Sequence, residues 1–215
     1  MKKLVVFDLD GTLVDSIADL GNAVNFALKE NNLPLNPMSD YYTFVGNGME
    51  DLVRRSMKDK GADDELYLKV RKVFDEHYRA HSNDNTVPYN GVGDLLSALS
   101  DKGVKTAVLT NKAHMYVGDI LAKCFPTHSF DLYFGQQEGV ERKPHPQSFN
   151  LLLSELKVKK EDCLYIGDSE VDVKTAINAG VDLVAVDWGY RSKEQIKEAG
   201  AEVIVSAPVE ILNYV

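Results

Sequence analysis

Short apolar runs of strand type alternate with helical patterns along most of this chain. Apolar residues recur with helical spacing over 94–100, 114–124, 147–156, 171–179 and 192–199. The strand-like runs are Leu4–Phe7, Thr106–Leu109, Leu132–Phe134, Leu164–Ile166, Leu183–Val186 and Val203–Val205. Such alternation favours an α/β fold, a doubly wound parallel sheet with a Rossmann-like core. Ligands of these sheets bind at the carboxyl ends of the strands.

The interval between the first and second strand-like runs is far longer than one crossover needs, since about a dozen residues suffice. Three apolar helical faces occupy it, over 17–28, 49–57 and 66–78. We therefore predict an α-helical cap over residues 16–85, inserted into a core of residues 1–15 and 86–215. Because the insertion leaves the core at the carboxyl end of the first strand, we expect a lid over the crevice.

The segment between the first two predicted helices contains Pro34, Pro37 and the sequence Gly46-Asn47-Gly48. We interpret it as loop, because proline and glycine clusters punctuate regular structure. Glycines in a loop also serve backbone geometry alone. If Gly46, Asn47 and Gly48 contact the substrate, backbone N–H groups at a helix start suit its anionic group, and these three are the candidate substrate-binding residues.

Composition and charge narrow the class of partner. The net charge of −9 at pH 7 is spread along the 215 residues, which argues against nucleic acid or an anionic membrane. An anionic metabolite then needs local positive charge from a metal or from lysines. Cys124 and Cys163 lie in apolar settings typical of a reducing compartment, and the run Leu4–Phe7 is too short for a secretory segment. We expect a cytoplasmic monomer or homodimer.

Two acids follow the first strand-like run directly, at Asp8 and Asp10. In an extended segment both side chains project to the same side, while Leu9 points away. Because an unpaired buried carboxylate is costly, such acids indicate a cation or a reacting group nearby.

Three further polar clusters accompany later strands. Thr110-Asn111 ends the second run, Lys143-Pro144-His145-Pro146 begins the helix before the fourth, and Gly167-Asp168 follows the fourth. If the strands are ordered 3-2-1-4-5-6, the first and fourth flank the switch point, which places Asp8, Asp10 and Asp168 together. Each cluster alone also has a structural interpretation, as a helix cap, a solvated lysine, a turn or, for Asp172, a first-turn acid.

These residue types match the demands of phosphoryl transfer. A carboxylate can attack phosphorus and form an acyl phosphate, and a second acid can protonate the leaving oxygen. Mg²⁺ prefers oxygen ligands and bridges carboxylates to phosphate. Thr110, Asn111 and Lys143 can hold the phosphoryl oxygens where charge develops.

The four clusters, in this order, resemble the motifs of the haloacid dehalogenase superfamily, and the nearest branch is that of phosphoglycolate phosphatase-like hydrolases. The resemblance implies that Asp8 is the nucleophile and a Mg²⁺ ligand. It implies that Asp10 is the acid–base residue, with its backbone carbonyl on the metal, and that Asp168 is a further metal ligand.

The same resemblance assigns the remaining positions. Thr110 and Lys143 bind the transferring phosphoryl group, Asn111 supports it, and Asp172 orients the metal shell or Lys143. The segment Trp188-Gly189-Tyr190 is similar to a loop after the fifth strand of these phosphatases. The expected substrate is a small phosphate monoester such as 2-phosphoglycolate.

Other activities remain open. Asp10 argues against a dehalogenase, because a departing halide needs no acid. A helix over 17–28 without histidine argues against a sugar-phosphate mutase, although a sugar-phosphate mutase or phosphatase and an inorganic pyrophosphatase stay as alternatives. A phospho-ligand-binding regulator without turnover is the non-enzymatic alternative, and the acids and lysine named above weigh against it.

Overall fold

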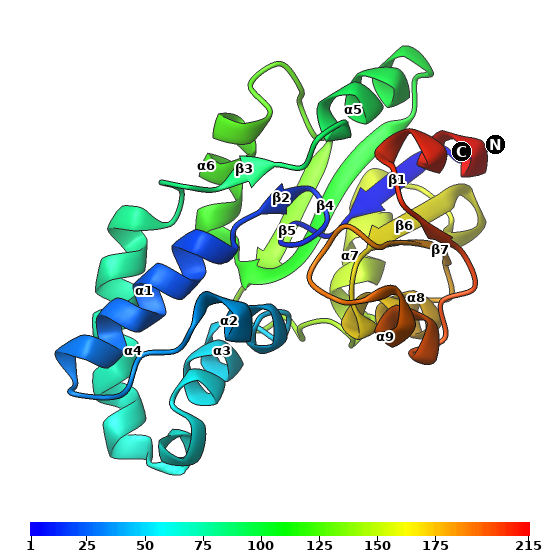
Figure 1. Cartoon of the computed structure of the whole chain (residues 1–215). Helices are drawn as coiled ribbons and strands as arrows, with labels where there is room; N and C mark the ends of the chain where they lie inside the picture. The colour runs from blue at the N-terminus through cyan, green and yellow to red at the C-terminus, as the bar shows by residue number, and fades with distance from the viewer. The chain divides into compact units, whose positions relative to one another are not determined.

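A computed structural model describes residues 1–215 (Figure 1). Contacts divide the chain into an α/β unit, residues 1–15 and 88–215, and a helical unit, residues 16–87. The second boundary lies two residues beyond the one expected from the sequence. Thr86 belongs with the helical unit because its backbone N–H and hydroxyl bond to Asp19.

The α/β unit is built on a six-stranded parallel sheet with the order β5-β4-β1-β6-β7-β8. Counted along the chain within this sheet, the order is 3-2-1-4-5-6, the order under which the acids after the first and fourth strands meet. Phe7, the last residue of β1, pairs with Val108 on one side and with Ile166 on the other. Its strands are β1 (Leu4–Phe7), β4 (Lys105–Ala113), β5 (Leu132–Gln136), β6 (Cys163–Gly167), β7 (Asp182–Val186) and β8 (Ile204–Val205).

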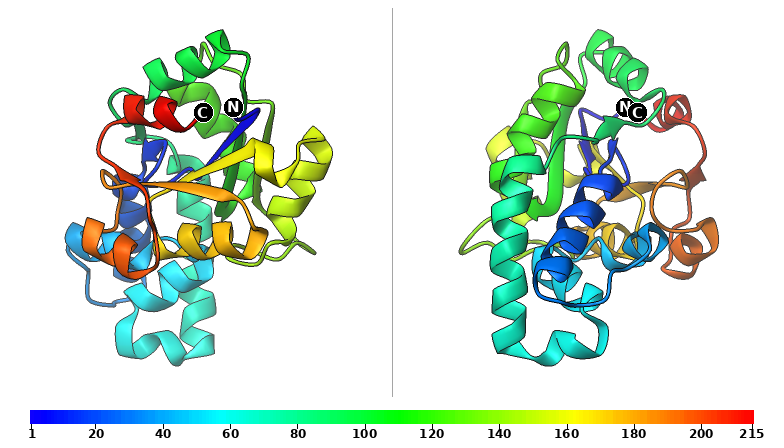
Figure 2. Two further views of the ribbon diagram at one scale, coloured as in Figure 1. Left: turned by 90° about the vertical axis from the view of Figure 1, so that its right-hand side faces the viewer. Right: turned by 60° about the vertical axis from the view of Figure 1, so that its left-hand side comes forward.

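Helices cover both faces of this sheet, as the alternating pattern predicts (Figures 1 and 2). Leu4 and Val6 of β1 pack in one core cluster with Phe149 and Ala176, so α7 and α8 cover that face. Right-handed crossovers place α5 and α6 on the opposite face. The helices are α5 (Val92–Asp101), α6 (His114–Cys124), α7 (Gln147–Leu156), α8 (Glu170–Ala179) and α9 (Lys193–Glu198), with a 3₁₀ helix at Pro208–Tyr214.

Strand β4 ends later than its apolar run indicates. The strand continues through Ala113, and its pairing register with β5 shifts between Leu109 and Ala113. The polar sequence from Thr110 to Lys112 suggested a strand end, yet these side chains are buried. The motif Thr110-Asn111 therefore lies within the strand, in its irregular final part.

The helical unit packs α1 (Ile17–Glu30) beside α4 (Asp64–His81), and both bury apolar faces (Figure 1). Between them come α2 (Met38–Phe44), α3 (Met49–Ser56) and a 3₁₀ helix at Lys58–Ala62. The segment of α2 was expected to be loop, and that expectation is wrong. Pro37 precedes α2 with a φ of −63°, which suits a helix start. Tyr41 is fully buried, and its hydroxyl donates to Asn25 Oδ1 at 2.9 Å.

A buried carboxylate joins the two ends of the helical unit. Asp19 of α1 accepts hydrogen bonds from the backbone and side chains of Asn85 and Thr86. Strands β2 (Val14–Asp15) and β3 (Val87–Pro88) form a separate two-stranded sheet. None of the helices combines the length and apolar character that crossing a bilayer requires.

Candidate active site

Three carboxylates gather at the carboxyl edge of the central strands. Asp8 follows β1, Asp168 follows β6, and Asp172 lies in the first turn of α8. One oxygen from each lies within 4.8 Å of the others. The structure thus brings Asp8 and Asp168 together, as the strand order implied, and the third carboxylate of the group is Asp172 and not Asp10.

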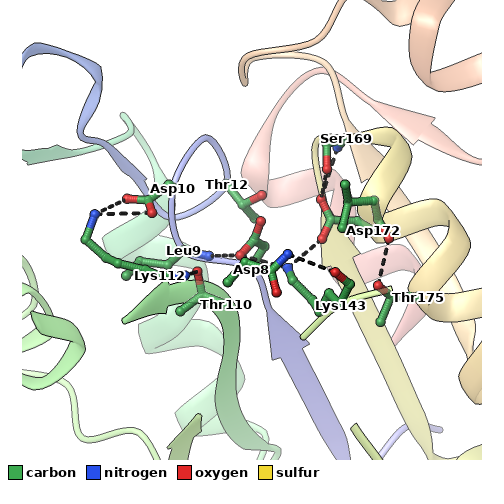
Figure 3. Close-up of polar contacts among 12 residues, drawn as sticks. Asp8, Leu9, Asp10, Thr12, Thr110, Lys112, Lys143, Ser169, Asp172 and Thr175 are labelled. Atoms are coloured by element: carbon green, nitrogen blue, oxygen red, sulfur yellow. Dashed lines mark hydrogen bonds and ion pairs between the residues drawn. The ribbon is translucent and has the colours of Figure 1, made fainter. Parts of the chain in front are cut away.

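Lys143 lies between Asp8 and Asp172 (Figure 3). Its Nζ is 2.9 Å from Asp8 Oδ1 and 2.8 Å from Asp172 Oδ1. It also donates to the hydroxyl of Tyr165 at 2.8 Å. Burial disfavours its charge, but Asp172 and Asp8 outweigh burial and raise the pKa of the ammonium. Lys143 is therefore a fixed cation beside Asp8.

Asp172 is bonded on both oxygens. Its Oδ1 accepts from Lys143 and from the Tyr165 hydroxyl, at 2.8 and 2.7 Å. Its Oδ2 accepts from the backbone N–H and the hydroxyl of Ser169, at 3.1 and 2.6 Å. Burial raises its pKa, but Lys143 and these donors more than offset burial and hold the pKa below the ordinary value. Asp172 therefore positions Lys143.

Tyr165 was not identified from the sequence. It lies in the middle of β6, fully buried, with its ring edge-on to Phe149 at 5.2 Å between centroids. A buried tyrosine hydroxyl requires a hydrogen-bond partner, which is the signal that could have found it. Burial, together with Asp172 and Asp8, holds its pKa well above the ordinary value, so it stays a neutral donor.

Two turns of the chain position the Asp168 carboxylate. It accepts from the hydroxyl of Thr12 at 2.9 Å and from the backbone N–H of Tyr190 at 2.8 Å. Gly11, with φ of 88°, and Gly189 both pack so closely that a Cβ on either would overlap this carboxyl group. The Trp188-Gly189-Tyr190 segment therefore positions Asp168, and Trp188 Nε1 also donates to the carbonyl of Thr12.

The electrostatics of the cluster favour a bound cation. Burial and neighbouring carboxylates raise the pKa of Asp8 to about 7 and of Asp168 to about 8, although Lys143 partly counters this at Asp8. The cluster thus contains three carboxylates, and the one ammonium among them pairs with Asp8 and Asp172. A divalent ion with oxygen ligands, such as Mg²⁺, fits this donor set. Asp8 and Asp168 are the candidate ligands, because four protein donors already engage Asp172.

Thr110 and Asn111 border the same site and are buried. The hydroxyl of Thr110 accepts from the backbone N–H of Lys112 at 3.1 Å. The side-chain amide of Asn111 donates to the carbonyl of Lys143 at 3.0 Å, which fixes the loop that carries the lysine. Asn111 therefore supports Lys143 directly.

The Asp10 side chain faces a different cation (Figure 3). Lys112 Nζ lies 2.9 and 3.2 Å from the two oxygens of Asp10. Sequence reasoning missed Lys112, although its position two residues after Thr110 on a strand places both side chains on one face. The site therefore has a second buried lysine, paired with the second aspartate of the Asp8-x-Asp10 sequence.

The turn at residues 46–48 belongs to the helical unit. Gly46 and Gly48 have φ values of 125° and 91°, and Gly48 directly precedes α3. Arg55 donates to the carbonyl of Phe44 and to Asn47 Oδ1, at 3.2 and 2.9 Å. The turn is therefore tied to the helix that follows it.

The raised pKa values predict how stability depends on pH without metal. Asp8 and Asp168 bind protons more tightly when folded than when unfolded, so the folded state holds more protons between about pH 4 and 8. We expect the free energy of unfolding to fall as pH rises from about 4 to 8 and to level off above that. Denaturant unfolding at pH 5 and pH 8 in chelator measures this, and Asp168→Asn should weaken the dependence. An opposite slope in the wild type contradicts the prediction.

At the switch point of this doubly wound sheet, the Asp8 carboxylate forms an ion pair with Lys143. Such an arrangement is suited to phosphoryl transfer. The family described as haloacid dehalogenase-like hydrolases matches residues 5–186. This chain belongs to that family.

Relatives at moderate identity narrow the class further. A phosphoglycolate phosphatase from Colwellia psychrerythraea is 34% identical over 206 residues, covering 94% of this chain and 91% of its own. A phosphoglycolate phosphatase from Aliivibrio fischeri is 32% identical over 207 residues, which cover 94% of this chain and 91% of the relative. The crystal structure of a predicted phosphoglycolate phosphatase from Haemophilus somnus is 31% identical with a TM-score of 0.90, over 99% of this chain and 97% of its own. The chain is a phosphatase of this type, an enzyme that hydrolyses phosphoric monoesters.

Proposed function

We propose that this enzyme is a Mg²⁺-dependent phosphatase for a small phosphate monoester, 2-phosphoglycolate or a similar phosphorylated acid, and that it works through an aspartyl phosphate. The observation that carries the proposal is the place of Asp8, which directly follows β1 and whose Oδ1 lies 2.9 Å from Lys143 Nζ inside the carboxylate cluster. The names of the relatives at 34% and 32% identity support the substrate.

Two displacements at phosphorus account for the reaction. A carboxylate oxygen of Asp8 attacks phosphorus, the ester P–O bond breaks, and Asp10 donates its proton to the leaving oxygen. Water then attacks the phosphorus of the aspartyl phosphate while Asp10 takes its proton. The acyl phosphate bond breaks, inorganic phosphate leaves, and the Asp8 carboxylate is restored.

The surrounding residues hold the phosphoryl group during both steps. The Lys143 ammonium and the Thr110 hydroxyl bind its oxygens, and Asn111 and Asp172 keep Lys143 in place. Asp8, Asp168 and the main-chain carbonyl of Asp10 would hold Mg²⁺. When bound, the ion neutralises charge between the nucleophile and the anionic substrate.

Selection of the alcohol part of the substrate is proposed to involve the helical unit as a cap. Gly46 and Gly48, with φ values of 125° and 91°, lead directly into α3, the first N–H groups of a helix suit an anionic group, and Arg55 holds the turn. Gly46, Asn47 and Gly48 therefore remain the proposed substrate-binding residues of this unit.

Phosphate release from a panel of compounds tests the function. The panel holds 2-phosphoglycolate, pyrophosphate and hexose phosphates, each with Mg²⁺. We expect the highest kcat/KM with 2-phosphoglycolate. If pyrophosphate or a hexose phosphate gives the highest kcat/KM, 2-phosphoglycolate is not the substrate. If the protein binds phosphate compounds but hydrolyses none of them, it is not a phosphatase.

Metal removal should abolish turnover, because Asp8 and Asp168 then repel an anionic substrate. We expect phosphate release to fall to background in excess chelator and to return with Mg²⁺. Ca²⁺ should inhibit, since its larger and looser coordination shell disturbs the geometry of attack. Chelator already saturated with Mg²⁺ is the control. Full activity after exhaustive chelation contradicts the prediction.

A further inference from the structure

We infer that Tyr165 is a positioning residue of the reaction: together with Asp172 it holds the Lys143 ammonium so that the remaining N–H faces the phosphoryl group. The inference rests on the proposed function, in which Lys143 binds the phosphoryl group that Asp8 attacks. Its basis is a closed set of hydrogen bonds. Lys143 Nζ donates to the Tyr165 hydroxyl and to Asp172 Oδ1, each at 2.8 Å, and the same hydroxyl donates to Asp172 Oδ1 at 2.7 Å.

The hydrogens of the Lys143 ammonium are fully used. An ammonium has three hydrogens to donate, and Lys143 has three acceptors: the Tyr165 hydroxyl, Asp172 Oδ1 and, at 2.9 Å, Asp8 Oδ1 (Figure 3). Tyr165 and the side chain of Asp172 are fully buried, whereas 13% of the Asp8 side chain is exposed. A substrate therefore reaches the ammonium from the side of Asp8, and the N–H directed at Asp8 is the one that turns to a phosphoryl oxygen.

The packed core fixes the position of the Tyr165 hydroxyl. Tyr165 lies in the middle of β6, and its partner on β1 is Val6, two residues before Asp8. Its ring packs edge-on to Phe149 of α7, with 5.2 Å between the ring centroids, in the core cluster that also contains Val6. The hydroxyl is thus held beside the strand that leads to the nucleophile.

Lys143 depends on such an anchor because neither a helix nor a strand carries it. It lies in the turn before α7, and a lysine side chain has a flexible four-carbon stem with much rotamer entropy. A cation stabilises developing charge best when its orientation is fixed before the reaction. Without the Tyr165 hydroxyl, one N–H of this buried ammonium loses its acceptor, which is costly. We therefore expect the ammonium to shift away from the orientation that the phosphoryl group requires.

The variant Tyr165→Phe tests the role, since it removes the hydroxyl and keeps the ring that packs against Phe149. Phosphate release is measured with Mg²⁺ and the panel compound that the wild type hydrolyses best, so the result does not depend on which monoester that is. We expect kcat/KM to fall by about tenfold to a hundredfold, the size of effect that a small displacement of a positioned group produces. An unchanged kcat/KM overturns the inference. An inactive wild type overturns the proposed function itself.

A double-mutant cycle with Lys143→Met distinguishes positioning of the ammonium from a purely structural role. If Tyr165 acts through Lys143, Tyr165→Phe has little further effect on kcat/KM once Lys143→Met is present. If the hydroxyl only stabilises the fold, Tyr165→Phe lowers kcat/KM by the same factor in both backgrounds, and that result overturns the inference.

The matched control is Tyr41→Phe. It also removes a hydroxyl from a fully buried tyrosine, in this case one of the helical unit that donates to Asn25. The control should lose some stability and keep the wild-type kcat/KM. Thermal unfolding of each variant confirms that activity is measured on folded enzyme.

A measurement on the ammonium itself does not depend on activity. In protein labelled with nitrogen-15 at lysine, the Lys143 ammonium should give a resonance protected from exchange with water, because its hydrogens are bonded and its side chain is 2% exposed. Lys143→Met identifies the resonance, and Tyr165→Phe should remove its protection. Rapid exchange in the wild type, or full protection in Tyr165→Phe, overturns the inference. The wild-type resonance still tests it should a variant fail to fold.

Discussion

Asp8→Asn should lower turnover by about four powers of ten or more, because an amide cannot replace the carboxylate that attacks phosphorus. The fold should survive, since the two side chains have nearly the same shape. Burial and the neighbouring Asp172 raise the pKa of Asp8, so its charge is unfavourable in the metal-free protein. The variant should therefore be at least as stable as the wild type at pH 8.

Phosphate release and thermal unfolding in chelator measure the two effects. Asp131→Asn is a matched control, because Asp131 accepts the backbone N–H of Thr106 near the other end of β4 and takes no part in the site. A fluoride complex of beryllium should also protect the wild type from unfolding more than it protects Asp8→Asn. If Asp8→Asn keeps near-normal turnover, Asp8 is not the nucleophile.

The replacement Lys143→Met should damage both activity and stability. The change leaves Asp8, Asp168 and Asp172 without the ammonium that lies 2.9 Å from Asp8 and 2.8 Å from Asp172. Breaking a buried ion pair in this way costs about 3–5 kcal/mol of unfolding free energy. Loss of a cation that binds the phosphoryl group lowers turnover by about a hundredfold or more.

The pH dependence separates this effect from a simple loss of packing. Without Lys143 the pKa of Asp8 rises further, and that of Asp172 rises from below its ordinary value, so the folded variant takes up protons as pH falls. The destabilisation measured in urea should be larger at pH 8 than at pH 5, and Mg²⁺ should reduce it. Lys105→Met controls for the loss of a surface lysine. A destabilisation of equal size at both pH values speaks against the electrostatic origin.

Several features of the site could be predicted because the information is local. Asp8 and Asp168 each follow an apolar strand, and the contrast between buried run and acid is visible along a few residues. The alternation of strands with helices favours a doubly wound parallel sheet, and the order 3-2-1-4-5-6 of such a sheet places the first and fourth strands side by side. From that order alone, the meeting of Asp8 and Asp168 follows.

Other features depend on which residues the packed sheet brings side by side. The apolar run of β4 stops at Leu109, so the sequence did not indicate that the strand continues to Ala113. Helix α2 follows a proline-containing segment and depends on Tyr41, which is buried and bonded to Asn25 of α1. Local propensity is weak at both places, and tertiary burial decides the outcome.

The sequence by itself determined the fold class, the types of polar residue that follow the strands and the family, because periodicity and the order of motifs are visible along the chain. Only the tertiary structure decided how the charges pair. It placed Lys143 against Asp8 and Asp172, and Lys112 against Asp10, at 2.8–3.2 Å. Partners 29 to 135 positions apart meet through strand register and side-chain direction, which no local pattern encodes.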